Sequence, residues 1–165
     1  MKTLLANKEQ KIALGLILLA VATRLLPHPP NFAPITGIAL FAAARFQGKY
    51  LAVLIPFLSL FLTDLLLGLS AITWFVYAGF GLILLLGFQT KKTRITTVLL
   101  SSVLFFVVSN LGVWVLHYPL TLEGLTACFT LAIPFFTNTL LGDLVYTGVL
   151  FFSFSSIKQY VLQPR

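Results

Sequence analysis

The stretch YLAVLIPFLSLFLTDLLLG, from Tyr50 to Gly68, decides how this chain of 165 residues folds. A helix needs about 20 apolar residues to cross the hydrocarbon core of a bilayer, and this stretch has that length with Asp64 as its one charge. The whole chain has the same character, since 59% of its residues are hydrophobic and 9% are charged. These proportions lie outside the range of soluble domains and predict an integral membrane protein.

Apolar runs on both sides of this stretch extend the pattern to six predicted membrane helices. Pro134 interrupts the last run, so we expect a short interfacial helix over about residues 122–131 before the last crossing. The sequence therefore predicts one all-α transmembrane domain over residues 1–165. The predicted crossings cover about residues 11–26, 34–46, 50–68, 73–88, 96–116 and 133–154.

Basic residues follow these runs in a regular order, because ten of the eleven Lys and Arg residues lie in alternate gaps. The positive-inside rule assigns such gaps to the cytoplasm, so we expect six crossings of a bacterial inner membrane with both termini cytoplasmic. The same rule accounts for the net charge of +7, and nucleic acid is therefore not expected as a partner. The other gaps hold Arg24, His28 and Glu123.

The two halves of the chain resemble each other weakly. Residues 55–58 read IPFL and precede Asp64, and residues 133–136 read IPFF and precede Asp143. Three crossings per half would give an inverted 3+3 repeat, an arrangement common in transporters. Chance similarity among Leu, Phe and Gly residues accounts for the pattern equally well.

Ionisable side chains inside a bilayer are costly, at about 3 kcal/mol for a central Arg or Asp on insertion scales, unless they are paired or hydrated. Asp64 and Asp143 are therefore the first candidates for a function. We expect Arg24, at the outer end of the first helix, to form an ion pair with Asp64. Satisfied hydrogen bonds between helices, or capping roles, are the equally weighted alternative.

Further polar and aromatic side chains are expected at similar depth, and such a mixture is typical of small-molecule pockets. Asn31 and the free amides that begin the second helix are suited to an anionic group on a ligand. Anchoring at the membrane interface is the favoured alternative for the aromatic residues. The predicted ligand-binding residues are Arg24, His28, Asn31, Asp64, Trp74, Asn110, Trp114, His117, Asn138 and Asp143.

Enzyme and metal chemistry are not expected. His28 and His117 are isolated, and no His-x-x-x-His or Cys-x-x-Cys spacing occurs. No Gly-x-Ser-x-Gly motif or phosphate-binding loop is present either. We therefore predict no catalytic residue, no metal ligand and no cofactor.

Three segments carry a resemblance to known families: RLLPHPPNFAP at residues 24–34, Pro56 through Asp64 to Gly68, and PFFTNTLLGD at residues 134–143. With the Ala-rich helix that ends at Arg45, they make the chain similar to an uncharacterised bacterial family of small six-helix proteins assigned to transport. More distantly, the chain resembles the substrate-binding S subunits of energy-coupling-factor transporters. This second resemblance implies a partner transmembrane coupling subunit with ATPases. The chain departs from S subunits because its first helix lacks their Ala-x-x-x-Ala docking surface.

We therefore expect a protein that binds a small solute, vitamin-like or metal-related, in an outward-facing cavity for uptake. The alternative is a membrane scaffold of the cell envelope that transports nothing. A cavity among the outer polar residues favours transport, whereas a fully packed outer half favours the scaffold.

Overall fold

The short helix α2 (Ile35–Arg45) lies at the centre of the molecule. The computed structural model describes residues 8–90 and 92–162. Within it, every residue of α2 from Thr36 to Ala42 is buried, and the helix contacts all five other α-helices. Because protein surrounds α2, its backbone and length are not constrained by contact with lipid.

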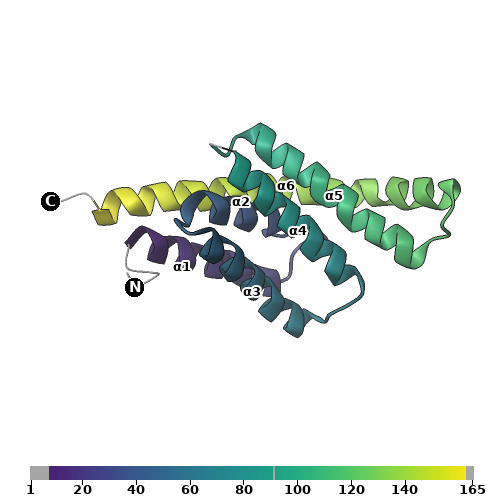
Figure 1. The fold of residues 1–165 in the computed structure, drawn as a ribbon, viewed down its shortest axis with the longest axis horizontal. Coiled ribbons are helices and arrows are strands. Elements are labelled where there is room, and N and C mark those ends of the chain that lie inside the picture. Colours follow the sequence, from purple (N-terminus) through teal and green to yellow (C-terminus); the bar gives the residue numbers. More distant parts are fainter. Residues whose placement is uncertain (1–7, 91, 163–165) are drawn as a thin grey trace.

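The longer helices pack around α2 (Figure 1). A single 3-10 turn, η1 (Thr23–Leu25), continues the first of them. Leu26 then has an extended backbone, because the following Pro27 disfavours a helical conformation at this position. The surrounding helices are α1 (Lys8–Ala22), α3 (Lys49–Leu67), α4 (Ile72–Gln89), α5 (Ile95–His117) and α6 (Leu122–Leu162).

Four of these helices, α3 to α6, are long and apolar enough to cross a membrane. The predicted all-helical fold with six α-helices is confirmed for the described residues. The first two helices are shorter than the crossings predicted at 11–26 and 34–46, since α1 has 15 residues and α2 has 11. Residues 8–90 and 92–162 therefore contain four helices of membrane-spanning length rather than six.

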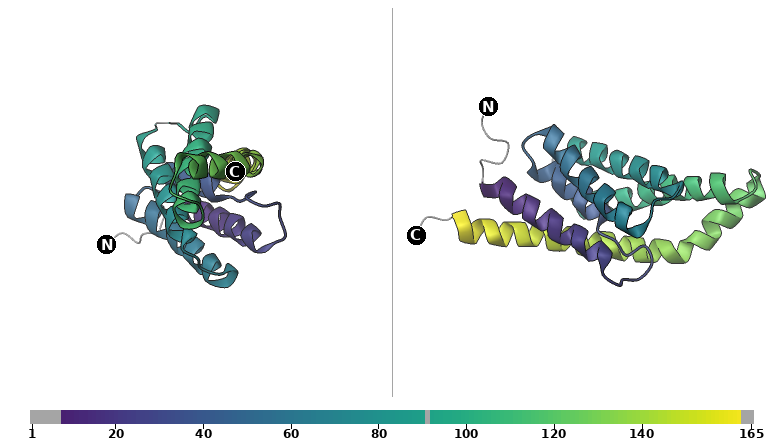
Figure 2. Two further views of the ribbon diagram at one scale, coloured as in Figure 1. Left: turned by 90° about the vertical axis from the view of Figure 1, so that its right-hand side faces the viewer. Right: turned by 90° about the horizontal axis from the view of Figure 1, so that it is seen from below.

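The predicted break before Pro134 is wrong, because α6 is one helix of 41 residues. An internal proline removes one backbone hydrogen bond and its ring crowds the preceding turn, which bends a helix without necessarily ending it. Figure 2 shows that the green N-terminal part of α6 is inclined to its yellow C-terminal part. At 1.5 Å per residue the helix is about 60 Å long, which exceeds the thickness of a bilayer. The separate helices expected at 122–131 and 133–154 are therefore parts of one element.

Small residues allow close contacts between α2 and its neighbours. A Cβ atom added to Gly37 would lie 3.0 Å from the backbone nitrogen of Thr147 on α6. A Cβ atom added to Gly87 on α4 would lie 2.8 Å from the Cβ of Ala43. The backbone of α2 thus approaches α6 and α4 as closely as small residues permit.

The described basic residues other than Arg24 gather at one end of the bundle, which we call the basic end. Here the Lys158 ammonium lies 2.9 Å from Glu9 Oε1 and connects α6 to α1. The Arg45 guanidinium lies 4.6 Å from the centroid of the Phe154 ring and connects α2 to α6. Lys2, Lys91 and Arg165, which also enter the charge pattern, lie outside the described residues. The basic end comprises Lys8, Lys11, Arg45, Lys49, Lys92, Arg94 and Lys158.

Candidate functional site

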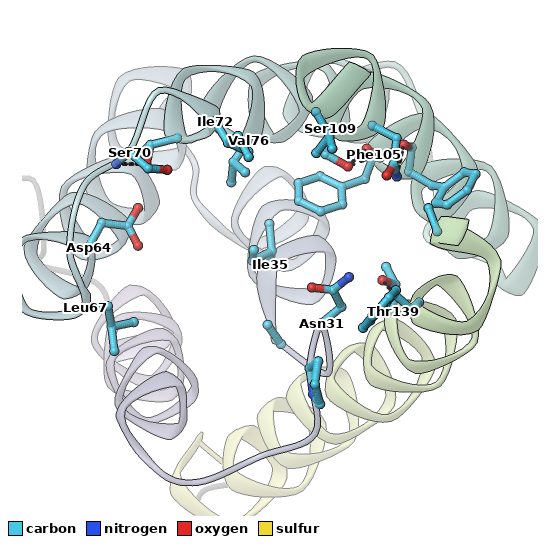
Figure 3. A pocket seen from close by; sticks show the side chains of 18 of the residues that line it. Asn31, Ile35, Asp64, Leu67, Ser70, Ile72, Val76, Phe105, Ser109 and Thr139 are labelled. Carbon is cyan, nitrogen blue, oxygen red and sulfur yellow. Dashed lines mark hydrogen bonds between the residues drawn. The ribbon is translucent and has the colours of Figure 1, made fainter. Parts of the chain in front are cut away.

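A cavity of about 670 Å³ opens over the N-terminal end of α2, at the end of the bundle away from the basic end. Its lining comes from η1, from the loop 26–34 and from α2 to α6. Figure 3 shows Asp64 and Leu67 on one wall and Phe105, Ser109 and Thr139 on the other. The volume is within the range of about 300–1,000 Å³ that is usual for small-molecule sites.

Six of the ten predicted ligand-binding residues line this cavity, although they come from distant parts of the sequence. They are Arg24, His28, Asn31, Asp64, Asn110 and Asp143. The helix arrangement therefore brings polar groups from η1, α3, α5, α6 and one loop to a common space.

The predicted ion pair between Arg24 and Asp64 is present. Arg24 Nη2 lies 2.6 Å from Asp64 Oδ1, and the two side chains are only 11% and 9% exposed. Arg24 Nη1 also donates to Thr63 Oγ1, and the Tyr77 hydroxyl donates to Asp64 Oδ2 at 2.8 Å. Both oxygens of this carboxylate have partners and its charge is compensated, so the group connects η1, α3 and α4 into one wall.

Asp143 has different surroundings, because no Lys, Arg or His within residues 8–90 and 92–162 forms a salt bridge with it. Its side chain is buried, and Asp143 is 2% exposed overall. The Ser102 hydroxyl donates to Asp143 Oδ2 at 2.6 Å, and the backbone amide of Thr36 faces the carboxylate. The first amides of a helix lack partners within the helix and carry partial positive charge, so Asp143 stabilises the start of α2.

Three polar residues of the α5 and α6 wall direct a hydrogen atom into their own helix. The Ser109 hydroxyl, the Asn110 amide and the Thr139 hydroxyl each donate to the carbonyl four residues earlier, at 2.8, 2.8 and 3.2 Å. A hydroxyl has one hydrogen atom and two lone pairs, and an amide oxygen only accepts. These side chains therefore keep oxygen lone pairs available as acceptors in the lining of the cavity.

The loop 26–34 covers part of the cavity. His28 Nδ1 lies 2.6 Å from the carbonyl oxygen of Leu26, which can only accept, so Nδ1 carries the hydrogen and Nε2 is an acceptor in the neutral ring. Asn31 has φ of 63°, in the left-handed region that Asn tolerates better than most residues. Asn138 of α6 donates to the Pro30 carbonyl at 3.0 Å and so holds the loop against this helix.

The other four predicted residues, among them Asn138, lie outside the cavity lining. Trp74 is 74% exposed, a position that suits an anchor at a membrane interface. Trp114 Nε1 donates to the Pro119 carbonyl at 3.0 Å and stabilises the connection between α5 and α6. His117 is exposed at the C-terminal end of α5.

Several residues of the site were not anticipated from the sequence, chiefly Ser109 and Thr139 in the lining and Ser102 behind Asp143. Hydroxyl groups are poor signals in an apolar helix, because most of them bond to their own backbone. Their position relative to predicted site residues could have identified them, because Thr139 precedes Asp143 by one helical turn and Ser109 is next to Asn110. Phe105, Phe106 and Phe135 complete the wall and supply apolar surface.

Metal-binding groups are not concentrated here. Across residues 8–90 and 92–162, no three His, Cys, Asp or Glu side chains come together in a way that could hold a metal ion. Cys128 is a free, buried cysteine in the lining of the cavity.

The fold and the cavity define an all-helical protein with membrane-length helices and a partly polar internal site. Residues 5–164 match the model of a family of unknown function, DUF6580, and the chain belongs to that family. Neither the curated proteins nor the solved structures contain a match to the chain.

Proposed function

We propose that the protein lies in the bacterial inner membrane and binds a small solute in this cavity for uptake into the cell. The observation that carries the proposal is a cavity of about 670 Å³ whose lining includes buried charged groups. Charged groups are expensive within a membrane and usually mark a substrate or ion pathway. A membrane scaffold would be expected to fill this space with side chains, so the cavity favours the transport class.

The proposed orientation follows from the charges. The basic end carries seven described Lys and Arg residues, and the cavity end carries Arg24 alone. Under the positive-inside rule the basic end is cytoplasmic, so the cavity opens to the outside. All six helices then take part in the membrane domain, with α2 enclosed by the others and both termini cytoplasmic.

A partner is part of the proposal, because the chain has no predicted phosphate-binding loop through which it could use ATP itself. Its resemblance to S subunits suggests a coupling subunit with ATPases. The Ala-x-x-x-Ala pair of α2, Ala39 and Ala43, is not available as a docking surface, since Ala39 is fully buried and the Cβ of Ala43 faces Gly87. Any such partner would therefore contact lipid-facing surfaces of the outer helices.

The proposal is tested by filling the cavity. Ala132 lines it, whereas Ala127 lies on the same helix, is exposed and is absent from the lining. Purified protein in lipid nanodiscs would be screened against a panel of vitamins and other small solutes by thermal unfolding. A ligand at 100 times its dissociation constant should stabilise the folded state by about 2.7 kcal/mol.

We expect at least one solute to raise the melting temperature of the native protein and of Ala127→Trp, but not of Ala132→Trp. The same solute should accumulate in cells that express the native protein and not in cells that express Ala132→Trp. A panel without any stabilising solute, or equal stabilisation of both Trp variants, would contradict the proposal.

A further inference from the structure

The charge of the cavity lining is unbalanced, and this imbalance bears on the ligand. Arg24 and Asp64 compensate each other at 2.6 Å, with Tyr77 on the second carboxylate oxygen. Asp143 is the remaining carboxylate of the lining, and no salt bridge to it exists among residues 8–90 and 92–162. A carboxylate in an apolar surrounding is stabilised most by an opposite charge placed beside it.

An anionic ligand group is disfavoured at this place. The start of α2 would attract an anion through its free amides and partial positive charge. However, the Thr36 amide already faces the Asp143 carboxylate, so the protein provides its own anion there. A second anion would lie beside Asp143 without a free cation to compensate it, because Arg24 is held by Asp64.

The hydrogen-bonding groups of the wall also favour a cationic ligand over an anionic one. Ser109, Asn110 and Thr139 each donate to their own helix and leave oxygen lone pairs open. His28 presents Nε2 as an acceptor when its ring is neutral. Together these four side chains offer more oxygen and nitrogen lone pairs than N–H or O–H groups, which suits a ligand that carries several N–H groups.

The aromatic rings of the lining also suit a cationic ligand. Phe105, Phe106 and Phe135 line the cavity, and Figure 3 shows the Phe105 ring directed into the space. The face of an aromatic ring attracts a cation within about 6 Å of its centroid. Rings on α5 and α6 thus line the same cavity as Asp143 and the open acceptors.

We infer that the solute is a protonated amine, with its ammonium group directed to Asp143 and its N–H groups to the acceptors of α5 and α6. This inference rests on the proposed solute-binding function and adds the charge and hydrogen-bonding type of the ligand. The carboxylate supplies the counter-charge, the phenylalanine rings enclose the apolar part, and the Arg24–Asp64 pair forms the opposite wall.

Matched series of ligands test whether the site prefers a positive, neutral or negative head group. The probes are 2-phenylethylammonium, 2-phenylethanol and 3-phenylpropanoate, with butyl and imidazolylethyl series of the same three head groups. Binding to the full chain in nanodiscs of uncharged lipid would be measured by calorimetry. We expect at least one ammonium member to bind about tenfold or more tightly than its alcohol and carboxylate counterparts.

Variants test whether the preference for an ammonium ligand comes from the Asp143 carboxylate. Asp143→Asn should bring the affinity for the ammonium ligand down to that for its alcohol counterpart. Glu123→Gln makes the same chemical change at an exposed residue outside the lining and should retain the preference. If Asp143→Asn does not fold, Phe105→Leu provides the second test, with an expected loss of about two- to fivefold for the ammonium ligand alone.

The outcomes separate this inference from the proposed function. Equal or tighter binding of an alcohol or carboxylate that Ala132→Trp abolishes would overturn the amine inference and support solute binding. An ammonium preference that persists in Asp143→Asn, or in Phe105→Leu where Asp143→Asn does not fold, would also overturn the inference. The absence of any ligand from both this set and the vitamin panel would overturn both.

Discussion

Arg24 and Asp64 illustrate how one pair of residues can hold a cavity wall in a bundle of membrane-length helices. The two side chains are nearly buried, and they connect η1 to α3 while Tyr77 adds α4. Breaking a buried pair by removing one partner leaves an uncompensated charge, which usually costs about 3–5 kcal/mol. The pair at the basic end differs, because Lys158 and Glu9 have side chains that are 46% and 34% exposed.

At the residue scale we predict that Arg24→Met lowers the free energy of unfolding by about 3–5 kcal/mol, because Asp64 would remain charged and buried. Lys158→Met, the matched control, should cost about 0–1 kcal/mol because exposed ion pairs contribute little. Thermal and denaturant unfolding of the purified variants would measure both changes. The double variant Arg24→Met, Asp64→Leu should recover part of the loss, and equal effects of the two single variants would contradict the prediction.

Helix α2 is the element on which the site depends, because the cavity lies over its first turn and Asp143 stabilises that turn. The position of α2 is set by close approach to α6. Gly37 faces the backbone of Tyr146 and Thr147, and backbone atoms cannot rotate away as a side chain can. The register of α2 against α6 therefore controls where the Asp143 carboxylate lies relative to the helix start.

At the element scale we predict that Gly37→Ala destabilises the protein by about 1–3 kcal/mol, the usual cost of overpacking, since its Cβ would lie 3.0 Å from the Thr147 nitrogen. Gly15→Ala makes the same change in α1, where nothing lies within 4 Å of an added Cβ. Helix propensity alone would make this control neutral or up to about 1 kcal/mol more stable. Similar melting temperatures for the two variants would argue against close α2–α6 packing.

Sequence reasoning predicted the parts of this molecule that depend on local composition. Long apolar runs located all six helices, and the scarcity of charge near Asp64 singled out Arg24 as its partner. The helix break predicted at Pro134 is wrong, since this residue lies within α6. Tertiary packing determined the rest: the burial of α2 and the Ser102–Asp143 contact depend on which helix faces reach the interior.

The whole molecule has two unlike ends, and the proposed direction of uptake depends on which end faces the cytoplasm. The loop between α3 and α4 contains Ser70, an exposed residue that lines the cavity. Gln89, the last residue of α4, is exposed at the basic end. Ser70 and Gln89 lie at opposite ends of α4, so they report the orientation of one membrane-length helix.

At this scale we predict opposite labelling of Ser70→Cys and Gln89→Cys in a Cys128→Ser background, which removes the native thiol. In intact spheroplasts, a membrane-impermeant maleimide should modify the cysteine at position 70 and should reach the one at position 89 only after permeabilisation. The physical reason is the proposed orientation, in which the basic end is cytoplasmic because Lys and Arg near helix ends oppose translocation. The reverse pattern would place the cavity on the cytoplasmic side, so a solute bound there would be leaving the cell or held for an intracellular partner.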